Sequence, residues 1–225
     1  MATVKVVDLI SRALTILKDP TAVRWTAVEL QGWLNDGYRE IVNRRPDANA
    51  QVGNFTCTAG YRQSITTTFA NAQRLLEVIA NKSSLSNKRS IRLVDRQSMD
   101  DQIPGWTDST PSISIEKYMF DHRLPKEFLT YPQAKAGTLV EIVYSTFPAA
   151  HALTEVQLMN PATATTINLD DTYANPLLDY MLYRAYSKDS EQQGNAARAV
   201  AHFQAMMNSL AGINTSEQAE VPEDR

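Results

Sequence analysis

The amino-acid sequence predicts an α+β protein: a helical bundle made from the N- and C-terminal helical hairpins, a central antiparallel β-domain, and a flexible C-terminal tail. Apolar residues recur every three or four positions in residues 4–46 and again after residue 170, as in amphipathic helices. Residues from about 50 to 150 are rich in Thr, Val, Ile and Tyr and are broken by Gly, Pro and Asn, as in short strands. Residues Thr215–Arg225 are acidic and nearly free of apolar side chains, so ordering them alone is unfavourable.

Two helices are expected before residue 48. The first covers residues 4–18 and ends at Asp19-Pro20. Thr26 with Glu29 forms a capping-box pattern at the start of the second, which continues to Arg45-Pro46. These helices are expected to pair as a hairpin.

The central region predicts short strands and one helix. The candidate strands are Phe55–Thr58, Gln63–Thr67, Leu75–Ala80, Ser90–Val94, Ser112–Glu116, Met119–Phe120, Phe128–Tyr131 and Leu139–Tyr144. Asp95–Gln102 is expected to form a short helix, since polar residues surround Met99.

Helical periodicity returns at Asp170–Ser187, where the Asp170-Asp171 pair is suited to cap the helix start. A final helix is expected from about Glu191 to Leu210, stopped by Gly212. Its predicted seam is Ala196, Val200, Phe203, Met207 and Leu210.

The predicted domains follow from these elements. A helical bundle domain comprises residues 1–48 with 169–212, and a β-domain comprises 49–150. Residues 151–168 are a linker, and 213–225 are the flexible C-terminal tail. The two helical ends pack most economically into one four-helix layer.

Composition excludes several classes of protein. The apolar runs are shorter than the roughly 18 residues of a membrane span, and the N-terminus lacks a signal-peptide pattern. A net charge of −3 gives no global attraction to nucleic acid. The single cysteine, Cys57, excludes an internal disulfide and a multi-cysteine zinc site and is expected to be a small apolar residue of a strand.

No catalytic, cofactor-binding or metal-binding motif is recognisable. The histidines His122, His151 and His202 lie in different predicted elements, and no glycine-rich phosphate loop is present. The Asp100-Asp101 pair is a solvated loop or a weak indication of glycosidase-like or metal chemistry. We therefore predict no enzyme and no cofactor.

Two groups of residues are candidates for interactions. Arg89, Arg92 and Arg96, near Lys82 and Lys88, form a local basic cluster that either faces solvent or a subunit, or contacts DNA phosphates. Apolar side chains on several faces of the last two helices are either core or a contact surface for another chain. The candidates for that surface are Tyr183, Phe203, Met206, Met207, Leu210, Ile213 and Val221.

Three segments together resemble the head-to-tail adaptor proteins of short-tailed bacteriophages, which include tail tubular protein A and related portal adaptors. The first is Leu30–Pro46, with Trp33-Leu34-Asn35-Asp36-Gly37-Tyr38 at its centre. The second joins Ile103–Trp106 to Tyr118–Pro132 and Val140–Pro148. The third is Asp170–Phe203, with Tyr173, Pro176-Leu177, Tyr180, Arg184-Ala185 and Asn195-Ala196.

The resemblance implies a structural virion protein at the head-tail junction, made in the host bacterial cytoplasm. Such an adaptor forms a homo-oligomeric ring, commonly a dodecamer, between the capsid portal protein and the tail nozzle or tube protein. Genomic DNA passes through its channel during ejection without sequence-specific binding, and no membrane is involved. The chain is then expected to be monomeric or weakly associated until it meets the portal.

Other functions remain open from the sequence. One is another ring protein of the tail, such as a nozzle or terminator. A second is a tail-associated cell-wall hydrolase that uses Asp100, Asp101 or Glu127. The third is a DNA-binding module that uses Arg89, Arg92 and Arg96.

Overall fold

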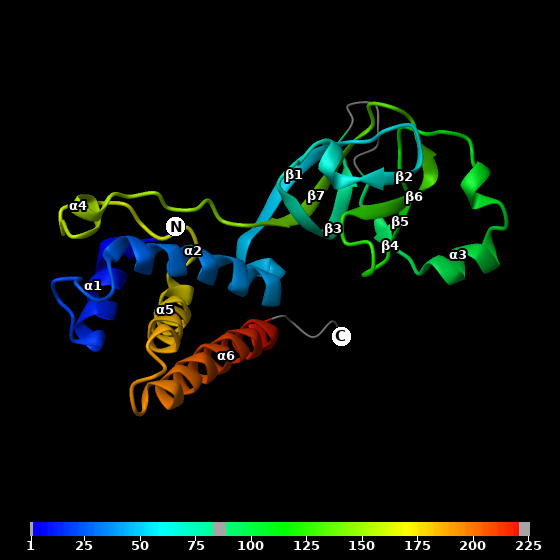
Figure 1. Cartoon of the computed structure of the whole chain (residues 1–225). Coiled ribbons are helices and arrows are strands. Elements are labelled where there is room, and N and C mark those ends of the chain that lie inside the picture. The colour runs from blue at the N-terminus through cyan, green and yellow to red at the C-terminus, as the bar shows by residue number, and fades with distance from the viewer. Residues whose placement is uncertain (1, 83–88, 221–225) are drawn as a thin grey trace. The chain divides into compact units, whose positions relative to one another are not determined.

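The computed structural model describes residues 2–82 and 89–220, which form two compact units (Figure 1). A helical unit consists of Met1–Arg44 with Pro148–Arg225, and a β-unit consists of Arg45–Phe147. Helices dominate the first and sheets the second, which confirms the predicted α+β class. Residues 221–225 of the predicted tail, which include Val221, lie outside the described residues.

The helical unit is built around α5. Its helices are α1 (Val6–Leu17), α2 (Ala27–Arg44), the one-turn α4 (Glu155–Leu158), α5 (Ala174–Lys188) and α6 (Asn195–Glu220), with a 3₁₀ turn at Asp171–Tyr173. α1, α2 and α6 all contact α5. The apolar stripes expected in the first two helices are buried, as Leu9 and Leu34 illustrate, because each helix turns one side to the core.

α2 and α5 approach each other closely at Gly37. A Cβ atom at Gly37 would lie 3.1 Å from Leu177 Cδ2 and 3.2 Å from Tyr180 Cδ1. Both of these side chains are buried and have little room to move. The glycine in the middle of α2 is therefore explained by packing, which compensates for its unfavourable helix propensity.

α6 differs from the prediction in both its length and its buried side. It continues through Gly212 to Glu220, because one glycine costs a helix only about 1 kcal/mol and the residues that follow are compatible with a helix. The predicted tail residues 213–220 are therefore helical. Ala196 and Val200, expected in the seam, are exposed, and the buried positions are Asn195, Ala199, Met206 and Leu210.

The segment after Pro148 packs along α2 through amide side chains. The Gln31 amide donates to the Leu153 carbonyl (3.1 Å) and accepts from the Leu153 N–H (2.8 Å). Asn35, one turn later, makes the same pair of bonds with His151 at 3.0 and 2.8 Å. These two side chains bond to the backbone of the segment as a neighbouring strand would. Because backbone groups make these bonds, the segment needs no repeating pattern of apolar residues.

The β-unit contains two sheets. One has the strand order β1-β7-β3 and the other β2-β6-β5-β4. The strands are β1 (Ala50–Thr56), β2 (Gly60–Ser64), β3 (Ala72–Asn81), β4 (Arg92–Leu93), β5 (Lys117–Phe120), β6 (Glu127–Ala134) and β7 (Leu139–Thr146). The unit also contains α3 (Arg96–Gln102) and 3₁₀ turns at Pro46–Asn49, Ile65–Thr67 and Trp106–Asp108. Phe55, Leu75, Phe128 and Ile142 belong to its main core.

Some strand predictions are wrong in detail. β4 and β5 pair in parallel, whereas the other pairs are antiparallel as expected. Gln63–Thr67 turns into a 3₁₀ helix after Ser64. Ser112–Glu116 is not a strand, because the buried Asn81 side chain takes the place of a strand partner: its Oδ1 accepts from the Ile115 N–H (2.8 Å) and its Nδ2 donates to the Ile115 carbonyl (2.7 Å).

Two local predictions in the β-unit are confirmed. The expected short helix is α3, and its N-cap Asp95 accepts hydrogen bonds from the Gln97 and Ser98 N–H groups. Cys57 is buried in the core, and this burial raises the pKa of its thiol to about 12. A thiol held in its neutral form is a poor nucleophile.

Candidate docking surfaces

The aromatic residues of α5 and α6 are largely used within the helical unit. The rings of Tyr183 and Phe203 lie 5.0 Å apart, and the guanidinium of Arg44 lies 5.6 Å from the Phe203 ring. Tyr186 stacks on His202 at 5.6 Å, and His202 Nδ1 lies 2.9 Å from an oxygen of Asp179. These contacts join α5, α6 and the end of α2 and leave Tyr183 and Phe203 half-buried.

The predicted contact residues of α6 divide into two sets. Met206 and Leu210 are 0% and 4% exposed, so they belong to the core of the helical unit. Met207 and Ile213 are half-buried and remain candidates with Tyr183 and Phe203. Val221 lies outside the described residues.

α6 presents an exposed side without charge, which we call the α6 face. Val200 is 56% exposed at its centre. The other residues of the face are Ala196, Ala197, Ala201, Gln204, Asn208, Ala211 and Gly212. No pattern in the amino-acid sequence marks this face, because alanine and glycine are weakly hydrophobic and fit a buried or an exposed position equally well.

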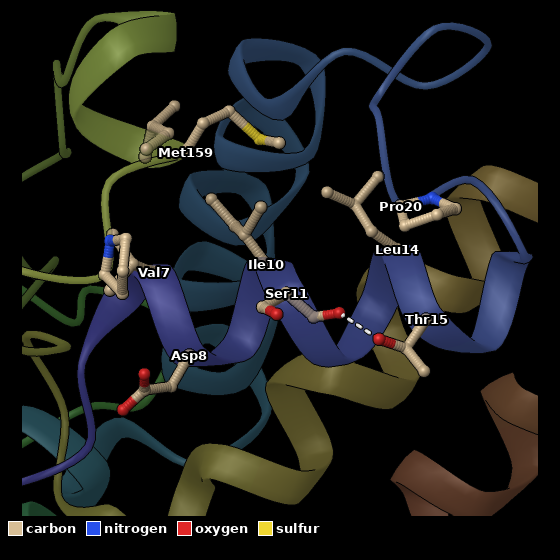
Figure 2. Close-up of a pocket in the computed structure, with 10 residues that line it drawn as sticks. Val7, Asp8, Ile10, Ser11, Leu14, Thr15, Pro20 and Met159 are labelled. Carbon is tan, nitrogen blue, oxygen red and sulfur yellow. Dashed lines mark hydrogen bonds between the residues drawn. The ribbon is translucent and has the colours of Figure 1, made fainter.

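A second candidate surface is a groove beside α1 (Figure 2). It encloses about 310 Å³, and Ile10, Leu14, Pro20, Leu158 and Met159 line its apolar part. Asp8, Ser11 and Thr15 line the polar part, where the Thr15 hydroxyl donates to the Ser11 carbonyl. Val156 on α4 and Val23 before α2 are also strongly exposed, so this end of the helical unit displays several apolar side chains.

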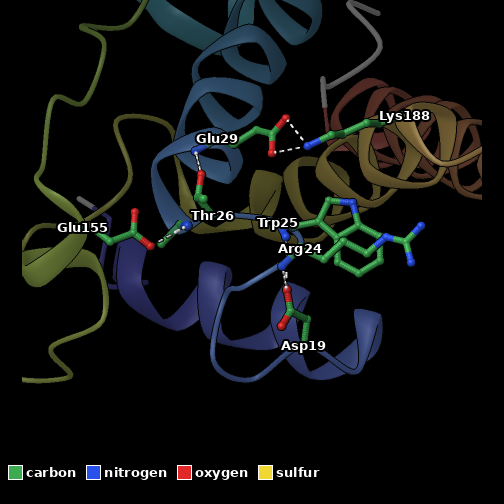
Figure 3. A network of polar contacts seen from close by, with 8 residues as sticks. Asp19, Arg24, Trp25, Thr26, Glu29, Glu155 and Lys188 are labelled. Carbon is green, nitrogen blue, oxygen red and sulfur yellow. Dashed lines mark hydrogen bonds and ion pairs between the residues drawn. The ribbon is translucent and has the colours of Figure 1, made fainter.

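Carboxylates fix the loops around that groove (Figure 3). Asp19 accepts backbone N–H bonds from Val23, Arg24 and Trp25, and the bond from Trp25 is the largest cause of the lowered pKa of Asp19. Glu155 of α4 accepts from the N–H groups of Ala27 and Val28 at 2.9 and 3.0 Å, at the start of α2.

The predicted capping box of α2 is present in part. Thr26 Oγ1 accepts from the Glu29 N–H at 3.2 Å, as expected. The Glu29 carboxylate instead pairs with Lys188 of α5, and its oxygens lie 2.7 and 2.8 Å from Lys188 Nζ. This ion pair joins the first turn of α2 to the last turn of α5.

The structure brings together only part of the basic cluster of the β-unit. Arg89 and Arg92 are exposed and line one shallow cleft with Glu116 and Lys117. Arg96 lies on α3 outside that cleft, with its Nε 3.7 Å from Asp100. Two of the three predicted arginines therefore form a shared surface, to which Lys117 adds a third positive charge.

The residues proposed for a hydrolase are only partly together. Asp100 and Glu127 line one groove of about 370 Å³, whereas Asp101 does not line it. Asp100 accepts from the Trp106 indole at 2.6 Å, and Glu127 lies 3.7 Å from Arg62. In the same groove, hydrogen bonds from Arg123 lower the pKa of Asp121. These carboxylates are engaged with donors and cations and do not form a recognisable acid/base pair.

Within residues 2–82 and 89–220, no group of three or more His, Cys, Asp and Glu side chains is arranged to hold a metal ion. In the same part of the chain, none of the helices has the length and hydrophobicity required to cross a membrane.

Comparison with known proteins identifies the family. No curated protein matches the chain. The family model described as SU10 adaptor protein matches residues 4–224, which include both the helical unit and the β-unit. An adaptor is a structural kind of virion protein, and the chain belongs to the SU10 adaptor protein family of bacteriophage head-to-tail adaptors.

Proposed function

We propose that this chain forms the ring that connects the capsid portal to the tail nozzle or tube of a short-tailed phage. The observation that carries the proposal is the match to the adaptor family over residues 4–224. In this function the ring contains about twelve copies and surrounds the channel through which DNA leaves the head.

A ring requires two different faces on each subunit, because a heterologous interface joins one patch to another patch of the next copy. The helical unit has two separate candidates for this role. One is the α6 face, which is long, rigid and uncharged. The other is the groove beside α1, whose apolar lining includes Leu14 and Met159.

The charge distribution suits passage of DNA without tight binding. The net charge of −3 repels phosphate overall and would prevent a narrow channel from gripping DNA. The exposed Arg89 and Arg92, with Lys117, are the described residues that we assign to transient phosphate contacts.

The proposal is tested by mixing the purified chain with portal rings and examining the product by negative-stain microscopy. We expect sizing chromatography to show a monomer or weak oligomer alone and microscopy to show a ring on one end of the portal, because a template reinforces many weak contacts. A stable ring without portal would contradict templated assembly, and the absence of any portal complex would contradict the adaptor function proposed.

A matched pair of variants tests the α6 face. Ala201→Glu places a charge on this face, whereas Ala59→Glu places one on an exposed turn of the β-unit. We expect at least tenfold weaker portal association for Ala201→Glu alone, since desolvating one unpaired carboxylate costs more than the 1.4 kcal/mol that this factor represents. Equal loss with both variants would remove the α6 face from the proposal.

The C-terminal end is a candidate contact with the portal itself. Deleting residues 214–225 preserves Leu210, which is buried, and therefore tests docking without opening the core. We expect portal binding to be lost and the thermal unfolding midpoint to stay within a few degrees of wild type. Undiminished portal binding would show that this end is not used.

A further inference from the structure

Strand β1 forms an unusually open edge of its sheet. It pairs with β7 on one side and stands at the end of the order β1-β7-β3. The pairing runs without a bulge from Ala50 opposite Ser145 to Thr56 opposite Leu139. Ala50–Thr56 contains no charged residue and no proline. Natural edge strands normally carry charges, prolines or bulges that prevent further pairing, and β1 carries none of them.

The orientation of the backbone shows which groups face away from β7. The Cys57 N–H donates to the Thr138 carbonyl (2.8 Å), so Cys57 faces β7. Because orientation alternates along an antiparallel strand, Phe55 and Gly53 also face β7, whereas Val52 and Asn54 face outward. The outward N–H of Thr56 agrees with this, since it donates to Thr68 Oγ1 at 3.4 Å.

The middle of this edge is open. At its beginning, the outward N–H of Ala50 donates to the Asp47 carbonyl, and at its end the outward N–H of Thr56 donates to Thr68 Oγ1. Among the described residues of the β-unit, no hydrogen bond reaches the outward backbone groups of Val52 and Asn54. Val52 is 64% exposed. Two N–H and two carbonyl groups are therefore presented at the spacing of a β-ladder.

The other strand edges of the described β-unit are closed or irregular. Along β3, the Leu75 N–H donates to the Pro125 carbonyl at 2.8 Å, and the Ile79 carbonyl accepts from the Ile91 N–H at 2.9 Å. The pairing of β3 with β7 is also irregular at three points. β4 is only two residues long, and β2 has an irregularity between Gly60 and Arg62.

A hollow lies beside the open edge. Gly53 has no side chain, and the Phe69 ring occupies the space, where a Cβ atom would meet Phe69 Cζ at 2.7 Å. Phe69 stacks on Tyr144 with the ring centres 4.2 Å apart. A hollow of about 320 Å³ next to these rings is also lined by Gln51, Thr146 and Phe147, and no charged residue lines it.

We propose that the outer edge of β1 accepts an extended, uncharged segment of a different protein as an added strand. Only an extended backbone matches the alternating donors and acceptors of Val52 and Asn54. An apolar side chain of the added strand, opposite Gln51, would enter the hollow at Phe69 and Tyr144. This site is distinct from the α6 face and does not depend on ring formation.

A second copy of the chain is the less suitable occupant. Pairing of β1 with the β1 of another copy is isologous, so it produces a twofold dimer in which both edges are used up. The remaining described edges are short, irregular or already bonded, as shown above for β3, β4 and β2. A segment of another polypeptide need not form a twofold dimer, and it does not require a second free edge on this chain.

The test uses the full chain and a synthetic probe. The probe is a fluorescein-labelled, end-capped octapeptide of alternating valine and threonine, and fluorescence anisotropy measures its binding. Val52→Pro removes an outward N–H without removing a bond to β7, and Val52→Thr is the matched control that retains the N–H. We expect saturable binding to wild type and Val52→Thr, and at least tenfold weaker binding to Val52→Pro.

A second measurement does not depend on how the variants fold. The same peptide, N-methylated at every residue so that neither of its edges can donate a backbone hydrogen bond, should not bind the wild-type chain. Equal binding of both peptides, equal binding to wild type and a folded Val52→Pro, or no binding of the unmodified peptide at millimolar concentration would overturn the proposal. Concentration-dependent dimerisation that Val52→Pro abolishes would overturn the choice of partner.

Discussion

At the residue scale, amide side chains replace backbone partners at several points of this chain. Gln31 and Asn35 hold residues 151–153 against α2, and Asn81 holds Ile115 beside β3. Gln63 is fully buried and bonds to Thr58 and Gly60 within one turn. Each carries both a donor and an acceptor, which lets one side chain satisfy a backbone carbonyl and a backbone N–H at the same time.

Asn81 allows a direct test of this role. Replacing Asn81, which is 0% exposed, with alanine leaves the N–H and carbonyl of Ile115 without that partner. We expect Asn81→Ala to lower the free energy of unfolding by about 1–3 kcal/mol, the usual cost of unpaired buried polar groups. Urea denaturation measures the loss, and the exposed Asn71→Ala is the control. An equal effect of both variants would contradict the role of Asn81.

His151 makes the stability of the helical unit depend on pH. Its Nε2 lies 2.9 Å from the Tyr38 hydroxyl, which itself accepts from the Asn168 N–H at 3.1 Å. The proton of the Tyr38 hydroxyl remains available to a neutral His151, whose unprotonated Nε2 accepts it. Burial lowers the pKa of His151 from its ordinary value of 6.5, so the unfolded chain takes up this proton first.

The stabilising contribution of neutral His151 is complete above about pH 6.5 and is lost as the pH falls below it. We expect the free energy of unfolding of the wild type to decline between about pH 7.5 and pH 5. His151→Gln should show a weaker decline, because it removes this titration and retains an acceptor. Chemical denaturation at several pH values provides both curves, and parallel curves would contradict the assignment.

At the scale of elements, the strong apolar patterns were predictable and the weak ones were not. The stripes of α1 and α2, with residues such as Leu14 and Leu34, are regular enough to fix a helix and its buried side. α6 contains adjacent Met206 and Met207 among alanines, so either of two sides of the helix could be the buried one. Ser112–Glu116 could not be placed, because the partner of Ile115 within it is a side chain distant in sequence.

The two methionines of α6 provide a matched comparison. Met206 is 0% exposed, and Met206→Ala is expected to cost about 2–5 kcal/mol through the cavity it leaves. Met207 is half-buried, and Met207→Ala should cost less than about 1 kcal/mol. Thermal and chemical denaturation of the two variants gives both values. A larger loss for Met207→Ala would mean that α6 buries the side that carries Val200, Phe203 and Met207.

The contact surfaces were less predictable than the helices that carry them. Tyr183 and Phe203 were recognisable as large apolar residues, but their contact with each other depends on how α5 and α6 pack. The α6 face and the edge of β1 are made of small or polar residues and of backbone groups. Such surfaces leave little trace in a single sequence, since no strong physical preference marks their residues.

At the scale of the molecule, the β-unit is a continuous segment with its own core. Arg45–Phe147 contains both sheets, and Phe55, Phe128 and Ile142 pack within it. We expect this segment, expressed alone, to fold with strand-type circular dichroism and a cooperative thermal transition. Dispersed amide resonances would confirm a packed structure. A non-cooperative transition would show that the segment requires the helical residues.

The insertion of the β-unit also determines an order of events on the ribosome. The helical unit needs segments from before and after the β-unit, since α1 and α2 contact α5. Helix α5 begins at Ala174, 130 residues after α2 ends at Arg44. At about 5–20 residues per second, the nascent α1 and α2 wait for several seconds with their apolar sides uncovered. During that interval their uncovered apolar sides can bind a chaperone, whereas the strands of the inserted β-unit can already pair into their sheets.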